Sequence, residues 1–194
     1  MEKKPRKKIY GVGVTSKGKY KTTCSGKHGK IYKMWRGILR RCYCEKFQQT
    51  SVSYKGCTIS EEWYDFQNFA SWCEDNYVEG YQIDKDILLK GNKVYSPETC
   101  CFVPHEINSM FTNKKRKRGA CLIGVVKRKN VYEANFSVKK KAIYLGTFLT
   151  EKEAFLAYKE AKEKHIKNIA EKWRGQITKK VYQALVNYKV EITD

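Results

Sequence analysis

The spacing of apolar residues predicts two helices in the first half of the chain. Between residues 30 and 44 the apolar positions recur at helical spacing, and three arginines fall mostly off that face. Ser60 would cap a second helix over 60–77, because two glutamates follow it in the first turn. We expect its aromatic residues to be core residues rather than a binding stripe. Residues 10–23 alternate and turn at 16–18, which predicts a hairpin.

The second half changes to short alternating segments followed by a long helical pattern. Residues 120–130, 131–140 and 141–148 predict three strands, with turns at Asn130 and at 139–141. Thr150 then starts a helix, and Glu153 completes a capping box. Its predicted buried stripe is Ala154, Phe155, Tyr158, Ala161, Ile166, Ile169 and Trp173. Residues 178–190 predict a short last helix.

The run NKKRKRG at positions 113–119 marks the division between the two halves. Consecutive cations followed by a glycine are typical of a solvated segment that does not pack. We therefore predict a first domain over residues 1–112, a basic linker over 113–119 and a second domain over 120–194. The predicted fold class is α+β, and the second domain is a three-stranded antiparallel sheet packed on one long helix.

The charge of the chain points to a polyanionic partner. Forty lysine and arginine residues stand against 20 aspartate and glutamate residues, a formal net charge of +20 at pH 7. Such an excess repels itself in the compact state unless a polyanion relieves it. Nucleic acid is therefore the leading partner, ahead of an anionic membrane surface or acidic proteins. We expect no membrane span, because no run approaches roughly 20 apolar residues, and no signal peptide, which predicts a cytosolic protein.

The cysteines are interpreted as small buried hydrophobic residues. Cytosolic thiols stay reduced, and the eight cysteines here do not form the paired C-x-x-C spacing of a structural zinc site. An alternative that stays open is a zinc site drawing on Cys42, Cys44, Cys57 and Cys100.

The predicted sheet offers a surface for nucleic acid. A small sheet with a helix on one face leaves its other face open, and a two- or three-stranded ribbon fits the DNA major groove. Strand-borne arginine can pair with guanine edges, whereas lysines contact phosphates. The candidate DNA-binding residues are Lys114, Lys115, Arg116, Lys117, Arg118, Lys127, Arg128, Lys129, Tyr132, Lys139, Lys140 and Lys141.

Residues 123–161 resemble the Apetala-type DNA-binding domain of plant ethylene-response factors and phage proteins. The resemblance rests on Gly124 and Val125, on Ala134 after a tyrosine-bearing strand, and on LGTF at 145–148. It continues into the helix with Ala154, Ala157 and Tyr158. It implies a three-stranded sheet laid into the major groove of duplex DNA.

The first half resembles the HNH-type homing endonucleases of phages. The matching pieces are YKMWRGILRRCY, YKGCTISEEWYDFQNFASW and IDKD…GNKVYSPETCCFVPHEIN, in this order. Such proteins often carry an Apetala-type domain as their DNA-targeting module. The resemblance implies a ββα-metal domain in front, a phage origin and a site in the host-cell cytoplasm.

The resemblance also assigns a candidate nuclease site around Asp84, Lys85 and Asp86. The family pattern at this strand is Asp-His, where the aspartate binds Mg²⁺ or Mn²⁺ and the histidine takes a proton from water. Asp84 matches the ligand, but Lys85 stands at the position of the base. Two carboxylates beside an ammonium keep it charged, and loss of a general base typically costs about 10²- to 10⁴-fold in rate.

Two ways to retain cleavage stay open. His105 and Asn108 lie three residues apart on a predicted helix, so that they share a face and could complete a metal site with Asp84. Water would then be activated by Asp86, by Glu106 or by His28. Alternatively, Lys85 contacts a phosphate and another group activates water.

Three functions follow from these patterns. The first is a DNA-binding protein of HNH homing type that nicks or cuts duplex DNA with a divalent metal. The second is a catalytically inactive HNH scaffold, a regulator or anti-defence protein that acts on host DNA or a host complex. Lys85 favours the second. The third is RNA binding, which is disfavoured because the open sheet lacks the aromatic pairs that stack unpaired bases.

Overall fold

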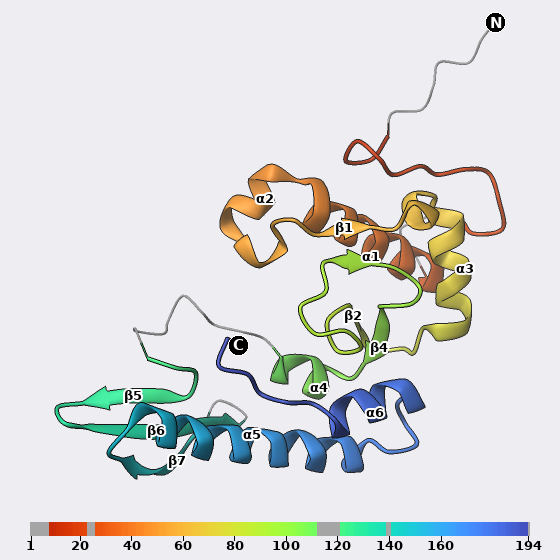
Figure 1. Cartoon of the computed structure of the whole chain (residues 1–194). Helices are drawn as coiled ribbons and strands as arrows, with labels where there is room; N and C mark the ends of the chain where they lie inside the picture. Colours follow the sequence, from red (N-terminus) through yellow and green to blue (C-terminus); the bar gives the residue numbers. More distant parts are fainter. Residues whose placement is uncertain (1–7, 23–25, 112–120, 139–140, 194) are drawn as a thin grey trace, which may run out of the picture. The chain divides into compact units, whose positions relative to one another are not determined.

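The computed structural model describes residues 8–22, 26–111, 121–138 and 141–193, and it divides the chain into two compact units (Figure 1). The first unit is Met1–His105 and the second is Glu106–Asp194. The predicted linker 113–119 lies outside the described residues. Within those residues, no helix is both long and apolar enough to cross a membrane.

The N-terminal unit combines helices with short strand pairs (Figure 1). Its helices are α1 (Gly26–Tyr43), α2 (Glu45–Thr50) and α3 (Phe66–Asn76), with 3₁₀ turns at Val52–Tyr54 and Glu61–Tyr64. Strand β1 (Thr58–Ile59) pairs in parallel with β3 (Val94–Tyr95), and β2 (Gln82–Asp84) pairs antiparallel with β4 (Cys101–Val103). Helix α4 (His105–Met110) follows β4 and carries the chain into the second unit.

The core of this unit lies between α1 and α3. The predicted stripe of α1 is confirmed, because Ile31, Trp35, Ile38, Leu39 and Cys42 are buried and Met34 is half-buried. Trp63, Phe66 and Phe69 are also buried, which confirms these aromatic residues as core. The indole Nε1 of Trp35 donates a hydrogen bond to the carbonyl oxygen of Trp63 at 2.8 Å, so that α1 is fixed to the turn before α3.

Two predictions for this unit are wrong. Residues 10–22 form no hairpin; instead the turn around Gly11 is closed by an Ile9–Gly13 bridge, and Val14 bridges Asp65. Ser60 precedes a 3₁₀ turn, and the α-helix begins only at Phe66, where the Asp65 side chain accepts the backbone N–H of Gln67. In both places contacts between distant segments override the local pattern.

The C-terminal unit is a three-stranded antiparallel sheet with a long helix, as predicted (Figure 1). Its strands are β5 (Val125–Arg128), β6 (Val131–Val138) and β7 (Lys141–Phe148), in the order β5-β6-β7. Its helices are α5 (Glu151–Lys172) and α6 (Lys179–Val186). The Thr150–Glu153 capping box is present at the start of α5. Strand β6 contributes Ala134 and Phe136 to the core beneath α5.

The second unit begins earlier in the chain than the sequence predicts. Residues 106–110 of α4 fall within the predicted first domain but belong to the second unit in the structure. Their attachment is specific: Glu106 accepts hydrogen bonds from Lys172 Nζ at 2.5 Å and from Trp173 Nε1 at 2.8 Å, and Lys162 Nζ donates to the Met110 carbonyl oxygen at 2.8 Å.

Candidate nucleic-acid interface and the Asp-Lys-Asp loop

The Asp84 carboxylate shapes the loop that follows β2. Its Oδ1 accepts the backbone N–H of Asp86 at 2.7 Å and that of Ile87 at 2.8 Å. An aspartate that bonds the backbone two and three residues further on stabilises a turn. Burial raises the pKa of this carboxyl above its ordinary value, in spite of the two N–H donors. Asp84 therefore has a structural role that the sequence did not show.

Lys85 is buried and links the two ends of the same loop by hydrogen bonds. Its side chain is 7% exposed, and its Nζ donates to Asp86 Oδ1 at 2.6 Å and to the Asn92 carbonyl oxygen at 2.5 Å. The ammonium also lies 5.9 Å from the centre of the Tyr95 ring. In the opposite direction, Asn92 Nδ2 donates a hydrogen bond to the Lys85 carbonyl oxygen at 2.8 Å. The two ends of the 85–92 loop are thus joined by reciprocal bonds.

Two other candidate ligands, His105 and Asn108, lie three residues apart on α4. His105 Nδ1 lies 3.3 Å from Gln82 Oε1, beside the start of β2. Gln82 and Asp84 are two positions apart on that strand, which is about 7 Å at roughly 3.3 Å per residue. Asn108 lies on α4 in the second unit, and the side chain of His28 falls outside the described part of the chain.

Carboxylate oxygens of the Asp-Lys-Asp stretch are already engaged by groups of the protein. One oxygen of Asp84 already accepts two backbone N–H groups, and Asp86 is paired with an ammonium. Across the described residues, no group of three or more His, Cys, Asp or Glu side chains is placed to hold a metal ion.

The cysteines of the N-terminal unit are core residues. Cys42, Cys57, Cys73, Cys100 and Cys101 are buried, as predicted, and Cys44 is half-buried. Burial raises the pKa of the Cys42 and Cys100 thiols to about 12, so both are protonated at neutral pH. Cys24 lies outside the described residues.

The strand register separates the two faces of the C-terminal sheet. Val125 pairs with Ala134, and Lys127 pairs with Tyr132, so these residues share the face that α5 covers. The opposite, open face is defined by exposed or half-buried side chains at alternate positions. They are Val126, Arg128, Val131, Glu133, Asn135, Ser137, Ala142, Tyr144 and Thr147.

The structure distributes the candidate DNA-binding residues over both faces and the turns. Arg128 lies on the open face, where its Nε is 3.2 Å from Glu133 Oε2. Lys127 is exposed on the helix side, with its ammonium 5.8 Å from the centre of the half-buried Tyr132 ring. Lys129 and Lys141 are exposed at the strand ends. Residues 114–118, Lys139 and Lys140 lie outside the described part.

Tyr144, which is not among the candidate DNA-binding residues, is the most exposed aromatic side chain of this sheet at 59%. It stands opposite Asn135 on the open face, and its hydroxyl is hydrogen-bonded to Thr147 Oγ1. The register shifts between Ala134, which pairs with Gly146, and Asn135, which pairs with Tyr144, and this leaves Leu145 as an extra residue in β7. Simple alternation along β7 therefore does not assign its faces, although Gly146 was a signal for a bulge.

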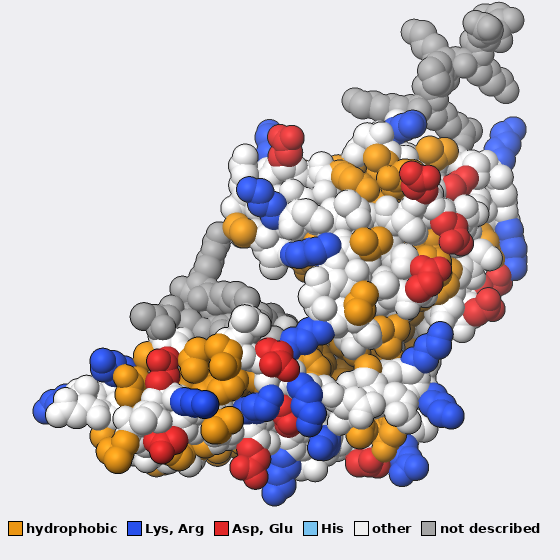
Figure 2. All heavy atoms as spheres, viewed as in Figure 1, with side chains coloured by type: hydrophobic (Ala, Val, Ile, Leu, Met, Phe, Trp, Pro, Cys, Tyr) orange, Lys and Arg blue, Asp and Glu red, His pale blue; other side chains and the backbone are white. Residues whose placement is uncertain are grey.

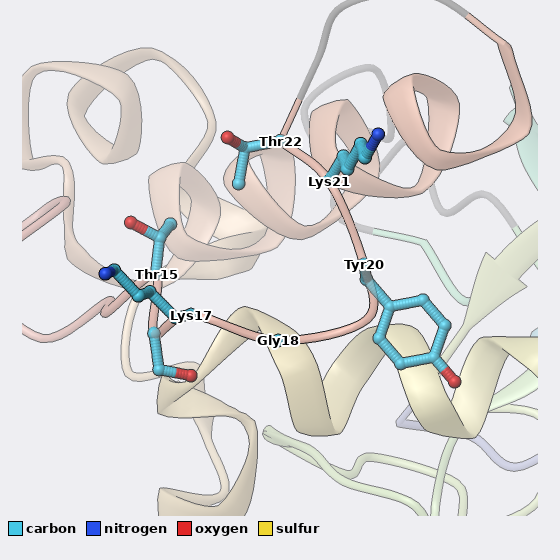
Figure 3. A pocket seen from close by; sticks show the side chains of 7 residues that line it. Thr15, Lys17, Gly18, Tyr20, Lys21 and Thr22 are labelled. Atoms are coloured by element: carbon cyan, nitrogen blue, oxygen red, sulfur yellow. The ribbon is translucent and has the colours of Figure 1, made fainter.

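A hollow in the N-terminal unit carries no converging charge. It has a volume of about 340 Å³ and lies within the loop Thr15–Thr22 of the N-terminal unit. Figure 3 shows Lys17 and Lys21 on opposite limbs of this loop, with their ammonium groups directed away from one another. Tyr20 turns its ring into the core, where its hydroxyl bonds Glu74.

Comparison with known proteins adds no relative. No protein-family model, no curated protein and no solved structure matches this chain.

Proposed function

We propose that this chain binds duplex DNA through the open face of the β5–β7 sheet. The supporting observation is the uneven charge of the strand region and of helix α5; on the open face itself Arg128 is paired with Glu133, so the excess comes from the strand ends and turns. Residues 125–148 contain six lysine and arginine residues and a single acidic residue, Glu133. Helix α5 contains six lysines and five glutamates, and Figure 2 shows basic and acidic side chains interspersed on the visible face. The excess positive charge thus belongs to the strand ends and the turns.

The shape and chemistry of the open face favour a duplex over unpaired bases. A three-stranded ribbon fits the major groove, where Arg128 reaches a guanine edge and the turn lysines contact phosphates. Tyr132 packs toward the core beneath α5, and Phe136 is buried there. Tyr144 therefore lacks the neighbouring aromatic residues on which single-stranded RNA is stacked.

We further propose that the chain occupies DNA without cutting it, on an HNH-type scaffold. Lys85 is held between Asp86 and Asn92 in a buried position, where its Nζ is engaged by both residues. Asp84 serves the same loop. In this account the protein is a phage regulator or anti-defence factor, which acts in the host cytoplasm on DNA or on a DNA-bound host complex.

The binding face is tested in the full chain with the double variant Arg128→Gln, Tyr144→Ser. Its matched control, Lys152→Gln with Leu156→Ser, removes one cation and one exposed apolar side chain from α5. We expect the open-face variant to weaken duplex binding at least roughly tenfold, since a bidentate arginine–guanine contact is worth about 1–3 kcal/mol. The control should bind like wild type. An equal decrease in affinity in both variants would place the interface elsewhere.

The absence of cleavage is tested with supercoiled plasmid in EDTA, Mg²⁺ and Mn²⁺. We expect retarded but intact DNA in all three. Metal-dependent nicks that disappear in Asp84→Ala would show a working nuclease and overturn this part of the proposal.

A further inference from the structure

A row of cations lies on the exposed face of α1, away from the core. Lys33, Arg36 and Arg40 are exposed there, with Gly37 between them. Their spacing of three, four and seven residues places them along one side of a helix. With Tyr10 they line an open hollow of about 220 Å³.

The cations of this row have no carboxylate partner among the described residues. Lys30 on the same helix, in contrast, pairs with Glu79. The two arginines contact aromatic rings instead. The Arg36 guanidinium lies 5.8 Å from the Tyr32 ring centre, and that of Arg40 lies 4.6 Å from the Phe47 ring centre. Such contacts orient the guanidinium groups and leave their positive charge available.

The surface beside Gly37 in this row is open. At Gly37 an added Cβ would meet no heavy atom within 4 Å. Tyr10 forms the opposite wall with a φ of 51°, which is uncommon for a bulky residue. The Ile9 and Gly13 backbones are joined by two hydrogen bonds of 2.8 Å, and Gly13 packs directly on Leu39 of α1. Backbone strain of this kind is concentrated at functional sites.

We propose that this α1 row, Lys33, Arg36, Gly37 and Arg40, binds the sugar–phosphate backbone of duplex DNA. From Lys33 to Arg40 the helix rises about 10 Å at roughly 1.5 Å per residue. Three cations along this length can each neutralise one phosphate of the backbone. Gly37 lets a phosphate approach the helix, and Tyr10 contacts a deoxyribose. The contact is independent of base sequence.

The inference rests on the proposed function for its ligand but uses none of the sheet residues. The first variant is Lys33→Gln, Arg36→Gln, Arg40→Gln in the full chain. Its charge-matched control removes three exposed lysines of the same unit: Lys17→Gln, Lys46→Gln, Lys55→Gln. The observable is the slope of log K against log salt for a random-sequence duplex of about 30 base pairs. The magnitude of this slope decreases by roughly 0.9 for each phosphate that the protein no longer neutralises.

We expect the α1-row variant to reduce the slope by roughly 2 to 3 and the control by less than 1. Equal slopes in the two variants would overturn the α1 contact while leaving sheet binding intact. A wild-type chain that binds no duplex at all would sink both proposals. Dependence on the open-face residues together with an unchanged α1-row variant would remove only this inference.

A second pair of variants distinguishes loss of the DNA contact from loss of folding. Because the space beyond Gly37 is open, Gly37→Glu and Gly37→Gln should both fold, with thermal melting as the check. We expect Gly37→Glu to weaken duplex binding about tenfold relative to Gly37→Gln, since a carboxylate among the cations repels phosphate. Equal affinity of the two folded variants would contradict the α1 contact.

Discussion

The role that the sequence suggests for Lys85 differs from the role that it has in the structure. In the sequence it stands where a nuclease of the resembling family has its general base. In the fold the residue as a whole, backbone included, is 5% exposed, and its ammonium is hydrogen-bonded to Asp86 and to the Asn92 carbonyl oxygen. The sequence reveals the unusual residue, but the partners that engage it lie up to seven positions away across a loop. The chemistry of the stretch was therefore predictable in part, and its structural use was not.

Lys85→Ala should destabilise the N-terminal unit. It leaves the Asn92 carbonyl oxygen and the Asp86 carboxylate without their buried donor. We expect the free energy of unfolding to fall by about 1–3 kcal/mol in urea denaturation. The exposed Lys46→Ala should change it by less than about 0.5 kcal/mol. A Lys85→Ala protein as stable as this control would show that the Lys85 hydrogen bonds do not stabilise the N-terminal unit.

Asp84 should make stability depend on pH. Burial raises its pKa in the folded protein, so the folded state keeps this proton at pH values where the unfolded chain has lost it. The free energy of unfolding therefore falls as pH rises from the ordinary carboxyl pKa through the raised one. Asp84→Asn keeps an oxygen acceptor but cannot ionise. We expect its stability relative to wild type to increase across this window; a difference that is constant with pH would argue against it.

At the scale of elements, prediction succeeded where local signals were sufficient. The three strands and α5 followed from alternation and from the Thr150–Glu153 capping box. Strands β1 and β3 were not predicted, because each has two residues and exists only through pairing with the other. The hairpin over 10–23 failed because this segment packs on α1, with Gly13 against Leu39.

The packing of β5 against α5 depends on Gly124. It has a φ of +79°, and an added Cβ would lie 2.0 Å from the Tyr158 ring. Gly175 has the same φ with nothing within 4 Å, so Gly175→Ala measures backbone strain alone, about 1–2 kcal/mol. We expect Gly124→Ala to lower the free energy of unfolding by about 1–3 kcal/mol more than Gly175→Ala does, because the added methyl group overpacks against Tyr158. Equal melting temperatures of the two variants would show that Tyr158 moves aside freely.

At the scale of the whole molecule, charge is the basis of the proposed function. The net charge of +20 indicated a polyanionic partner, and the structure adds where the charge is uncompensated. On the exposed face of α1, Lys33, Arg36 and Arg40 have no carboxylate partner among the described residues, whereas Arg128 of β5 is paired with Glu133. Sequence alone could not separate these cations from paired ones such as Lys30 and Lys19, whose glutamate partners are distant in the chain.

The central claim is that the full chain binds duplex DNA through many phosphates. The most direct test is equilibrium binding of the wild-type protein to a labelled duplex by fluorescence anisotropy over a series of salt concentrations. We predict that affinity falls by about 10³-fold or more between roughly 50 and 200 mM salt. Affinity that hardly changes over this range, or the absence of duplex binding at the lowest salt, would contradict the account.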